Sequence, residues 1–104
     1  MSVKKIHILG ICGTFMGSLA LLARELGFEV SGCDENIYPP MSNLLQEQSI
    51  RVNQGYKKTD LPEADLYIIG NVISRGNESI EYILDSKLPH TSGPAWLSEN
   101  VLQN

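Results

Sequence analysis

The sequence predicts an α/β fold, a single domain built on a doubly wound parallel sheet of about five strands. Short apolar runs typical of buried parallel strands alternate with segments whose apolar residues recur at helical spacing. The first apolar run, 6–9, passes directly through a glycine-rich turn into a helix-patterned segment. A chain of 104 residues is long enough for one such domain and its core, but not for two.

The first half of the chain is expected to alternate strand and helix. Glycine after an apolar periodic segment ends a helix, so Gly27 is expected as the C-cap residue of the first helix. Pro39 and Pro40 cannot lie inside a helix but can precede one. We therefore expect strands at 5–9, 29–33 and 50–53, and helices at 18–26 and 42–48.

The second half continues the alternation after a polar loop at 57–63. Asp65–Gly70 is the strongest strand signal, and a brief fifth strand is expected at Pro89–Ser92. Asn77 is a suitable N-cap for a helix at 78–86, and a last helix opens at 93–94. Trp96, at helical spacing with its apolar neighbours, is expected in the core.

Strand order determines where a ligand binds in such a sheet. In the common order 3-2-1-4-5, the chain reverses direction between strands one and four, and a crevice opens there at the carboxyl ends of the strands. The loops that follow these two strands are 10–17 and 71–77, so both are expected to line one site.

The loop Gly10-Ile11-Cys12-Gly13-Thr14-Phe15-Met16-Gly17 is the main candidate for that site. A glycine-rich turn before a helix presents bare backbone N–H groups and the positive end of a helix dipole, which favour a phosphate or pyrophosphate. The spacing G-x-x-G-x-x-x-G differs from the dinucleotide pattern G-x-G-x-x-G. Bulky Phe15 also leaves less room for a flat pyrophosphate, which disfavours NAD.

Other candidate site residues each have two interpretations. Arg75 is either the counter-charge of a bound phosphate or a solvent-exposed arginine. Asp34 lies 24 positions after Gly10, close to the spacing of the acid that holds a ribose hydroxyl in dinucleotide-binding folds, and it either binds such a hydroxyl or caps a turn. Tyr56 and His7 are expected to pack in the core, although Tyr56 could also stack on a base.

Composition excludes several classes of partner and ligand. The net charge of −4 leaves no broad basic surface for nucleic acid or an anionic membrane. No apolar run approaches the ~20 residues that span a bilayer, and the N-terminus leads into a strand, so a cytoplasmic protein is expected. Cys12 and Cys33 fit no metal-binding spacing and are interpreted as reduced thiols rather than a disulfide or a catalytic thiol.

Several segments together resemble the N-terminal domain of the Mur ligase family. They are 8–17, Ser31-Gly32-Cys33-Asp34, Tyr38-Pro39-Pro40-Met41-Ser42, Gln54-Gly55-Tyr56, Ile69-Gly70-Asn71, Arg75-Gly76-Asn77 and Ser92-Gly93-Pro94-Ala95-Trp96-Leu97. The resemblance implies a Rossmann-like domain that binds the UDP part of UDP-N-acetylmuramate. The residues it implies as ligands are Gly10, Cys12, Gly13, Thr14, Phe15, Met16, Gly17, Asp34, Gly55, Asn71, Ser74, Arg75 and Asn77.

The branch of the family that the chain resembles implies a bacterial ligase of cell-wall recycling. Such a ligase uses ATP and Mg²⁺ to join a recovered murein tripeptide to the lactyl carboxylate of UDP-N-acetylmuramate. The family's ATP-binding loop, G-T-x-G-K-T, does not occur in these residues. We therefore expect a substrate-binding domain that holds no cofactor and is inactive alone. The alternatives are a stand-alone NAD-dependent oxidoreductase of Rossmann type and a non-catalytic nucleotide-sensing module.

Overall fold

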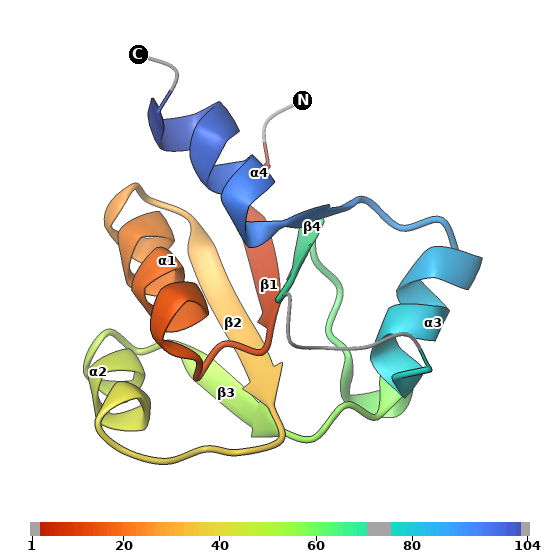
Figure 1. Cartoon of the computed structure of the whole chain (residues 1–104), viewed down its shortest axis with the longest axis horizontal. Helices are drawn as coiled ribbons and strands as arrows, with labels where there is room; N and C mark the ends of the chain where they lie inside the picture. The colour runs from red at the N-terminus through yellow and green to blue at the C-terminus, as the bar shows by residue number, and fades with distance from the viewer. Residues whose placement is uncertain (1–2, 71–75, 103–104) are drawn as a thin grey trace.

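A computed structural model describes residues 3–70 and 76–102 as a parallel sheet with helices on both faces (Figure 1). The sheet has five strands in the order β3-β2-β1-β4-β5, and each neighbouring pair is parallel. This confirms the fold class and the strand order predicted from sequence. The strands are β1 (Lys5–Leu9), β2 (Glu29–Asp34), β3 (Arg51–Gln54), β4 (Leu66–Ile69) and β5 (His90–Ser92).

Two groups of helices cover the two faces of the sheet. One face carries α1 (Thr14–Glu25), α2 (Met41–Glu47) and α4 (Gly93–Leu97), which continues into the π-helical turn η2 (Ser98–Leu102). The other face carries α3 (Glu78–Asp85) and the short 3₁₀ helix η1 (Lys58–Asp60). In the part of the chain that the structure describes, no helix is both long and apolar enough to cross a bilayer.

Strand β1 lies at the centre of the sheet and is buried on both faces. Ile6 and Ile8 belong to the larger core, beneath α1 and α2. Leu9 belongs to the smaller core beneath α3, and His7, also buried, contacts the Tyr67 ring of that core at a centroid distance of 6.1 Å. Burial on both sides explains why this strand is almost continuously apolar.

Most capping predictions are confirmed. Gly27 has a φ of 102° and follows the C-cap residue Leu26 of α1, a conformation that glycine adopts without strain. Oδ1 of Asn77 accepts hydrogen bonds from the main-chain N–H groups of Ser79 (3.0 Å) and Ile80 (3.2 Å) at the start of α3. Trp96 is buried and meets Phe28 edge-on at 5.8 Å.

The start of α1 corrects the expected boundary. The helix begins at Thr14 and not at Ser18, so Gly17 lies inside it. A side chain at Gly17 would meet Met41 of α2, whose Sδ would lie only 2.4 Å from the added Cβ. Gly17 therefore serves the close packing of α1 against α2, and the turn itself is confined to residues 10–13.

Candidate functional site

The turn after β1 uses its own amides to fix its shape. Gly10, with a φ of 85°, directs the chain out of the strand. The N–H groups of Gly10 and Ile11 both donate to the carbonyl of Cys33, at 2.8 and 3.2 Å, and that of Gly13 donates to the carbonyl of Gly10 at 3.2 Å. Together with Cys12, whose N–H donates to Asp34, these residues are not the bare donors that the sequence predicted.

The donors available to a ligand lie one step further on, in the first turn of α1. The N–H groups of Thr14, Phe15 and Met16 have no intrahelical acceptor, because the helical bonds begin with Gly17 N–H donating to the carbonyl of Gly13 at 2.7 Å. The N-cap residue Gly13 has no side chain to cap them, and the first turn holds no acidic residue. This helix end therefore offers an anion both hydrogen bonds and a favourable dipole.

Asp34, at the end of β2, joins the glycine turn to the loop that follows β2. Its Oδ2 accepts from the N–H of Cys12 at 2.9 Å, and its Oδ1 accepts from the N–H of Asn36 at 3.1 Å. The turn-capping interpretation is thus realised in the structure. Contact with a ribose hydroxyl stays a prediction. It is compatible with the structure, because each carboxylate oxygen retains a second lone pair.

Replacing Asp34 by alanine is expected to lower the free energy of unfolding by about 1.5 kcal/mol, because two main-chain N–H groups lose a charged acceptor. Asparagine keeps one acceptor oxygen and should lose about half as much. Urea unfolding of Asp34→Ala and Asp34→Asn measures both values. Equal stability of the alanine variant and the parent chain would contradict this structural role.

The side chains of Met16 and Phe15 both pack against Gly93, so the loop is not the bare glycine cradle that the sequence predicts. Met16 is buried, and its side chain packs where a Cβ at Gly93 would fall, 2.8 Å from its Sδ. Only its main chain is left for a ligand. The Phe15 ring lies over the same glycine, 2.8 Å from a Cβ built there, and stays 47% exposed.

The remaining predicted ligands are only partly placed by the structure. Gly55 follows β3 with a φ of 90°, and its N–H donates to the carbonyl of Asp34 at 2.9 Å, so it lies at the same edge of the sheet. Asn77 uses its side-chain oxygen to cap α3, which leaves only its amide nitrogen for a ligand. The other predicted ligands, Asn71, Ser74 and Arg75, lie outside the described residues and stay predictions.

The cysteines are free thiols on opposite faces of the sheet. Cys12 is buried in the core beneath α1, and Cys33 is buried in the core beneath α3. Burial, with the nearby Asp34 carboxylate as a second cause, raises the pKa of Cys12, and the same causes raise that of Cys33 to about 12. The two thiols are unpaired in the structure and lie in different cores, in agreement with the interpretation as reduced cysteines.

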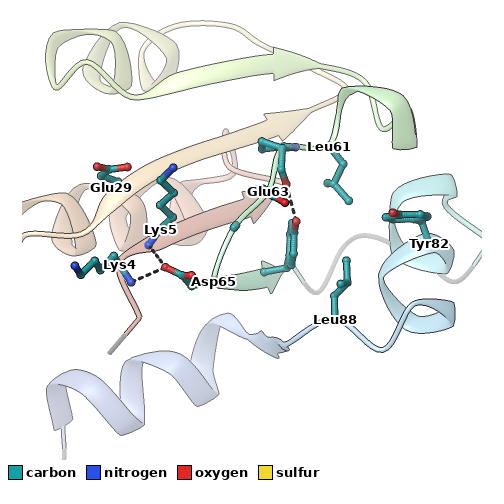
Figure 2. A pocket seen from close by; sticks show the side chains of 11 residues that line it. Lys4, Lys5, Glu29, Leu61, Glu63, Asp65, Tyr82 and Leu88 are labelled. Atoms are coloured by element: carbon teal, nitrogen blue, oxygen red, sulfur yellow. Dashed lines mark hydrogen bonds between the residues drawn. The ribbon is translucent and has the colours of Figure 1, made fainter. Parts of the chain in front are cut away.

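A separate hollow lies at the other end of the sheet, where the strands begin (Figure 2). It has a volume of about 580 Å³, and its lining includes Lys4, Lys5, Glu29, Glu63, Asp65 and Tyr82. The Asp65 carboxylate there accepts from the main-chain N–H groups of Lys4 and Lys5, both at 2.9 Å. Ligands of doubly wound sheets bind at the carboxyl ends of the strands, so this amino-end hollow is not the predicted site.

The described residues do not contain the ligands of a metal ion. No group of three or more His, Cys, Asp or Glu side chains comes together in residues 3–70 and 76–102. The Asp34 carboxylate, beside the glycine turn, already accepts from two main-chain N–H groups.

The strand order and the uncapped end of α1 are typical of nucleotide-binding α/β domains, which hold the anion at the point where the strand order reverses. Comparison with known proteins makes the class specific. Residues 5–104 match the model of the Mur ligase family, catalytic domain. The chain belongs to the Mur ligase family.

Two similar relatives are ligases of the same name. The UDP-N-acetylmuramate–L-alanyl-gamma-D-glutamyl-meso-2,6-diaminoheptandioate ligase of Escherichia coli is 56% identical over 96% of the chain. The ligase of that name from Haemophilus influenzae is 48% identical over 98% of the chain. The chain spans only 22% and 23% of the lengths of these two proteins.

Solved structures agree with this placement. A murein peptide ligase from Psychrobacter arcticus matches with a TM-score of 0.92 and 57% identity, over 96% of the chain and 21% of that protein. The UDP-N-acetylmuramate–alanine ligase MurC of Thermotoga maritima matches with a TM-score of 0.86 at 20% identity, over 98% of the chain and 23% of that protein. At that identity, the second match supports the Rossmann-like fold alone.

Proposed function

We propose that this chain is the UDP-N-acetylmuramate-binding domain of a cytoplasmic, ATP-dependent ligase that joins murein tripeptide to that sugar nucleotide in peptidoglycan recycling. The observation that carries the proposal is the first turn of α1, where Thr14, Phe15 and Met16 offer N–H groups at the carboxyl edge of the sheet. Family membership and the similarity to UDP-N-acetylmuramate ligases support a UDP-sugar as the ligand.

The domain contributes binding and orientation to the proposed reaction. Its helix end holds the pyrophosphate, and Asp34 and Gly55 border the adjoining space on the β2 and β3 side. We assign ATP, Mg²⁺ and the tripeptide to the remaining length of the relatives, because the chain spans 22% and 23% of them and does not contain the G-T-x-G-K-T loop. The chain alone is expected to bind the sugar nucleotide and to form no amide bond.

The alternatives receive less support. A stand-alone NAD-dependent oxidoreductase would need room for a dinucleotide pyrophosphate along a G-x-G-x-x-G turn. Here four amides of the turn are bonded within the protein, and the exposed Phe15 ring stands next to the remaining donors. Calorimetric binding of NADH without binding of UDP would favour that class, and binding of an adenine nucleotide alone would favour a sensing module.

Replacing Thr14 by proline removes one of the proposed ligand donors without breaking a helical hydrogen bond. Proline is favoured at the first helical position, and Gly13, at φ −67° and ψ 152°, has the extended conformation that a residue before proline requires. UDP-N-acetylmuramate affinity is expected to fall about 30-fold, the effect of losing a hydrogen bond worth about 2 kcal/mol to a charged group. Isothermal titration calorimetry measures it.

Thr14→Ala is the matched control, because it removes the hydroxyl and keeps the N–H. Its affinity should stay within about threefold of the parent chain, and both variants should unfold at the parent's urea midpoint or above. A proline variant that is folded and binds the sugar nucleotide as tightly as the parent would refute binding at this helix end.

A further inference from the structure

The loop that follows β2 carries an exposed aromatic side chain beside the proposed anion site. Tyr38 is 60% exposed, and its neighbour Ile37 is also exposed. The Asp34 carboxylate links this loop to the glycine turn, because it accepts from the N–H of Cys12 at 2.9 Å and from the N–H of Asn36 at 3.1 Å. Three residues after Tyr38, the side chain of Met41 packs against Gly17 of α1. Tyr38 therefore lies in the segment between the contact of Asp34 with the glycine turn and the contact of Met41 with α1.

This loop is held in place along its length. Asn36 N–H donates to Asp34 Oδ1 at 3.1 Å, and Gln54 Nε2 donates to the carbonyl of Glu35 at 3.4 Å. The carbonyl of Tyr38 accepts from Ser42 N–H at 3.2 Å. An aromatic ring on so well anchored a loop is presented to solvent at little further entropic cost, which is the property of a binding platform.

The position of the Tyr38 ring determines whether it can contact the base or the pyrophosphate of a nucleotide. In doubly wound sheets, the pyrophosphate lies at the end of the first helix and the ribose lies near the acid that ends the second strand. The base then extends beyond that acid, over the loops that follow β2 and β3. Tyr38 is in the first of these loops, whereas Phe15 lies against Gly93 on the side of β5 and α4.

We propose that Tyr38 is the stacking platform for the pyrimidine base of the bound nucleotide, an inference that rests on the function proposed above. Every base has an aromatic face, so stacking on Tyr38 supplies affinity that a phosphate or sugar alone does not receive. Binding of the base then depends on the Tyr38 ring, whereas binding of the pyrophosphate depends on the first turn of α1.

Calorimetric titration of UDP into three tyrosine variants of the chain tests this inference. Tyr38→Ala should weaken UDP binding about tenfold, and Tyr38→Phe, which keeps the ring, should stay within about twofold of the parent. Tyr82→Ala is the matched control, because Tyr82 is also an exposed tyrosine, at 43%, but lines the hollow at the other end of the sheet (Figure 2). It should bind UDP as the parent does.

Nuclear magnetic resonance supplies a second readout. The Tyr38 ring protons should shift upfield on addition of UDP and stay unshifted on addition of pyrophosphate, which has no base. Parent-like binding of UDP by Tyr38→Ala, or an equal ring shift with pyrophosphate, would overturn the platform and leave the proposed function standing. Absence of UDP binding by the parent chain would overturn both.

Discussion

Replacing Gly32 by alanine is expected to lower the free energy of unfolding by about 3 kcal/mol. The substitution should also displace the turn that leads to the proposed anion site. Gly32 lies in β2, directly beneath the turn that follows β1. A Cβ built on it falls 2.4 Å from Cδ1 and 2.7 Å from Cβ of Ile11, and 2.7 Å from the carbonyl oxygen of Ile8. The last contact is with the main chain of the central strand, so rotation of one side chain cannot relieve it.

The loss should appear in binding as well as in stability. Ile11 is fully buried, and its N–H donates to the carbonyl of Cys33, so pushing Ile11 outward moves the turn that leads into α1. Urea unfolding measures the stability of Gly32→Ala, and calorimetry with UDP-N-acetylmuramate at a temperature where the variant is folded measures its affinity.

Gly13→Ala is the matched control for this prediction. Gly13 has an ordinary negative φ of −67°, and the nearest atom to a Cβ there is the carbonyl oxygen of Gly10, at an unstrained 3.5 Å. Its free energy of unfolding should stay within about 1 kcal/mol of the parent, because the restriction of the unfolded chain by alanine offsets the weaker preference for alanine over glycine at an N-cap. Equal stability of the two alanine variants would show that β2 tolerates a side chain at Gly32.

The architecture was predictable because its signals are local and repeated. The continuous apolar run of β1 reflects burial on both faces, and Gly27 and Asn77 end and begin helices through their own conformations or side chains. Parallel strands joined by helices then restrict the topology to few orders, of which 3-2-1-4-5 is the one observed.

The details of the site depend on partners far away in the sequence, which no local pattern reveals. A glycine-rich turn predicts bare amides, but Gly10 and Ile11 donate to Cys33, and Cys12 donates to Asp34. The sequence pattern also places Gly17 in the turn. The structure explains this glycine by a tertiary contact, the close packing of α1 against Met41 of α2.

Tyr38 is a second residue whose role cannot be predicted from the local sequence. Beside Pro39 and Pro40, it looks like an ordinary turn residue in the sequence. Its significance comes from exposure combined with the hydrogen bonds that fix the loop around it, and both are properties of the folded chain. A single large aromatic residue in a turn beside a predicted ligand crevice is the only sequence signal that could have found it.

Acid is expected to destabilise the protein through His7, by about 1.4 kcal/mol per pH unit as the pH falls from 6.5 towards 4. His7 is buried in the central strand; its Nδ1 lies 2.8 Å from the Ser31 hydroxyl oxygen, and its Nε2 has no partner within the described residues. Burial lowers the pKa of His7 from 6.5 to about 4. Between these values the unfolded chain binds a proton that the folded chain does not, so stability is full above the upper value and is lost on acidification.

Urea unfolding from pH ~7 down to ~4 measures this dependence. His90 offers the control, since it is exposed on β5 and His90→Gln should keep the parent's slope, whereas His7→Gln should flatten it. The imidazole resonances of the parent chain give a test that needs no variant. Those of His7 should remain in their neutral form until the pH approaches 4, and a midpoint near 6.5 would show that the central strand accommodates the charged ring.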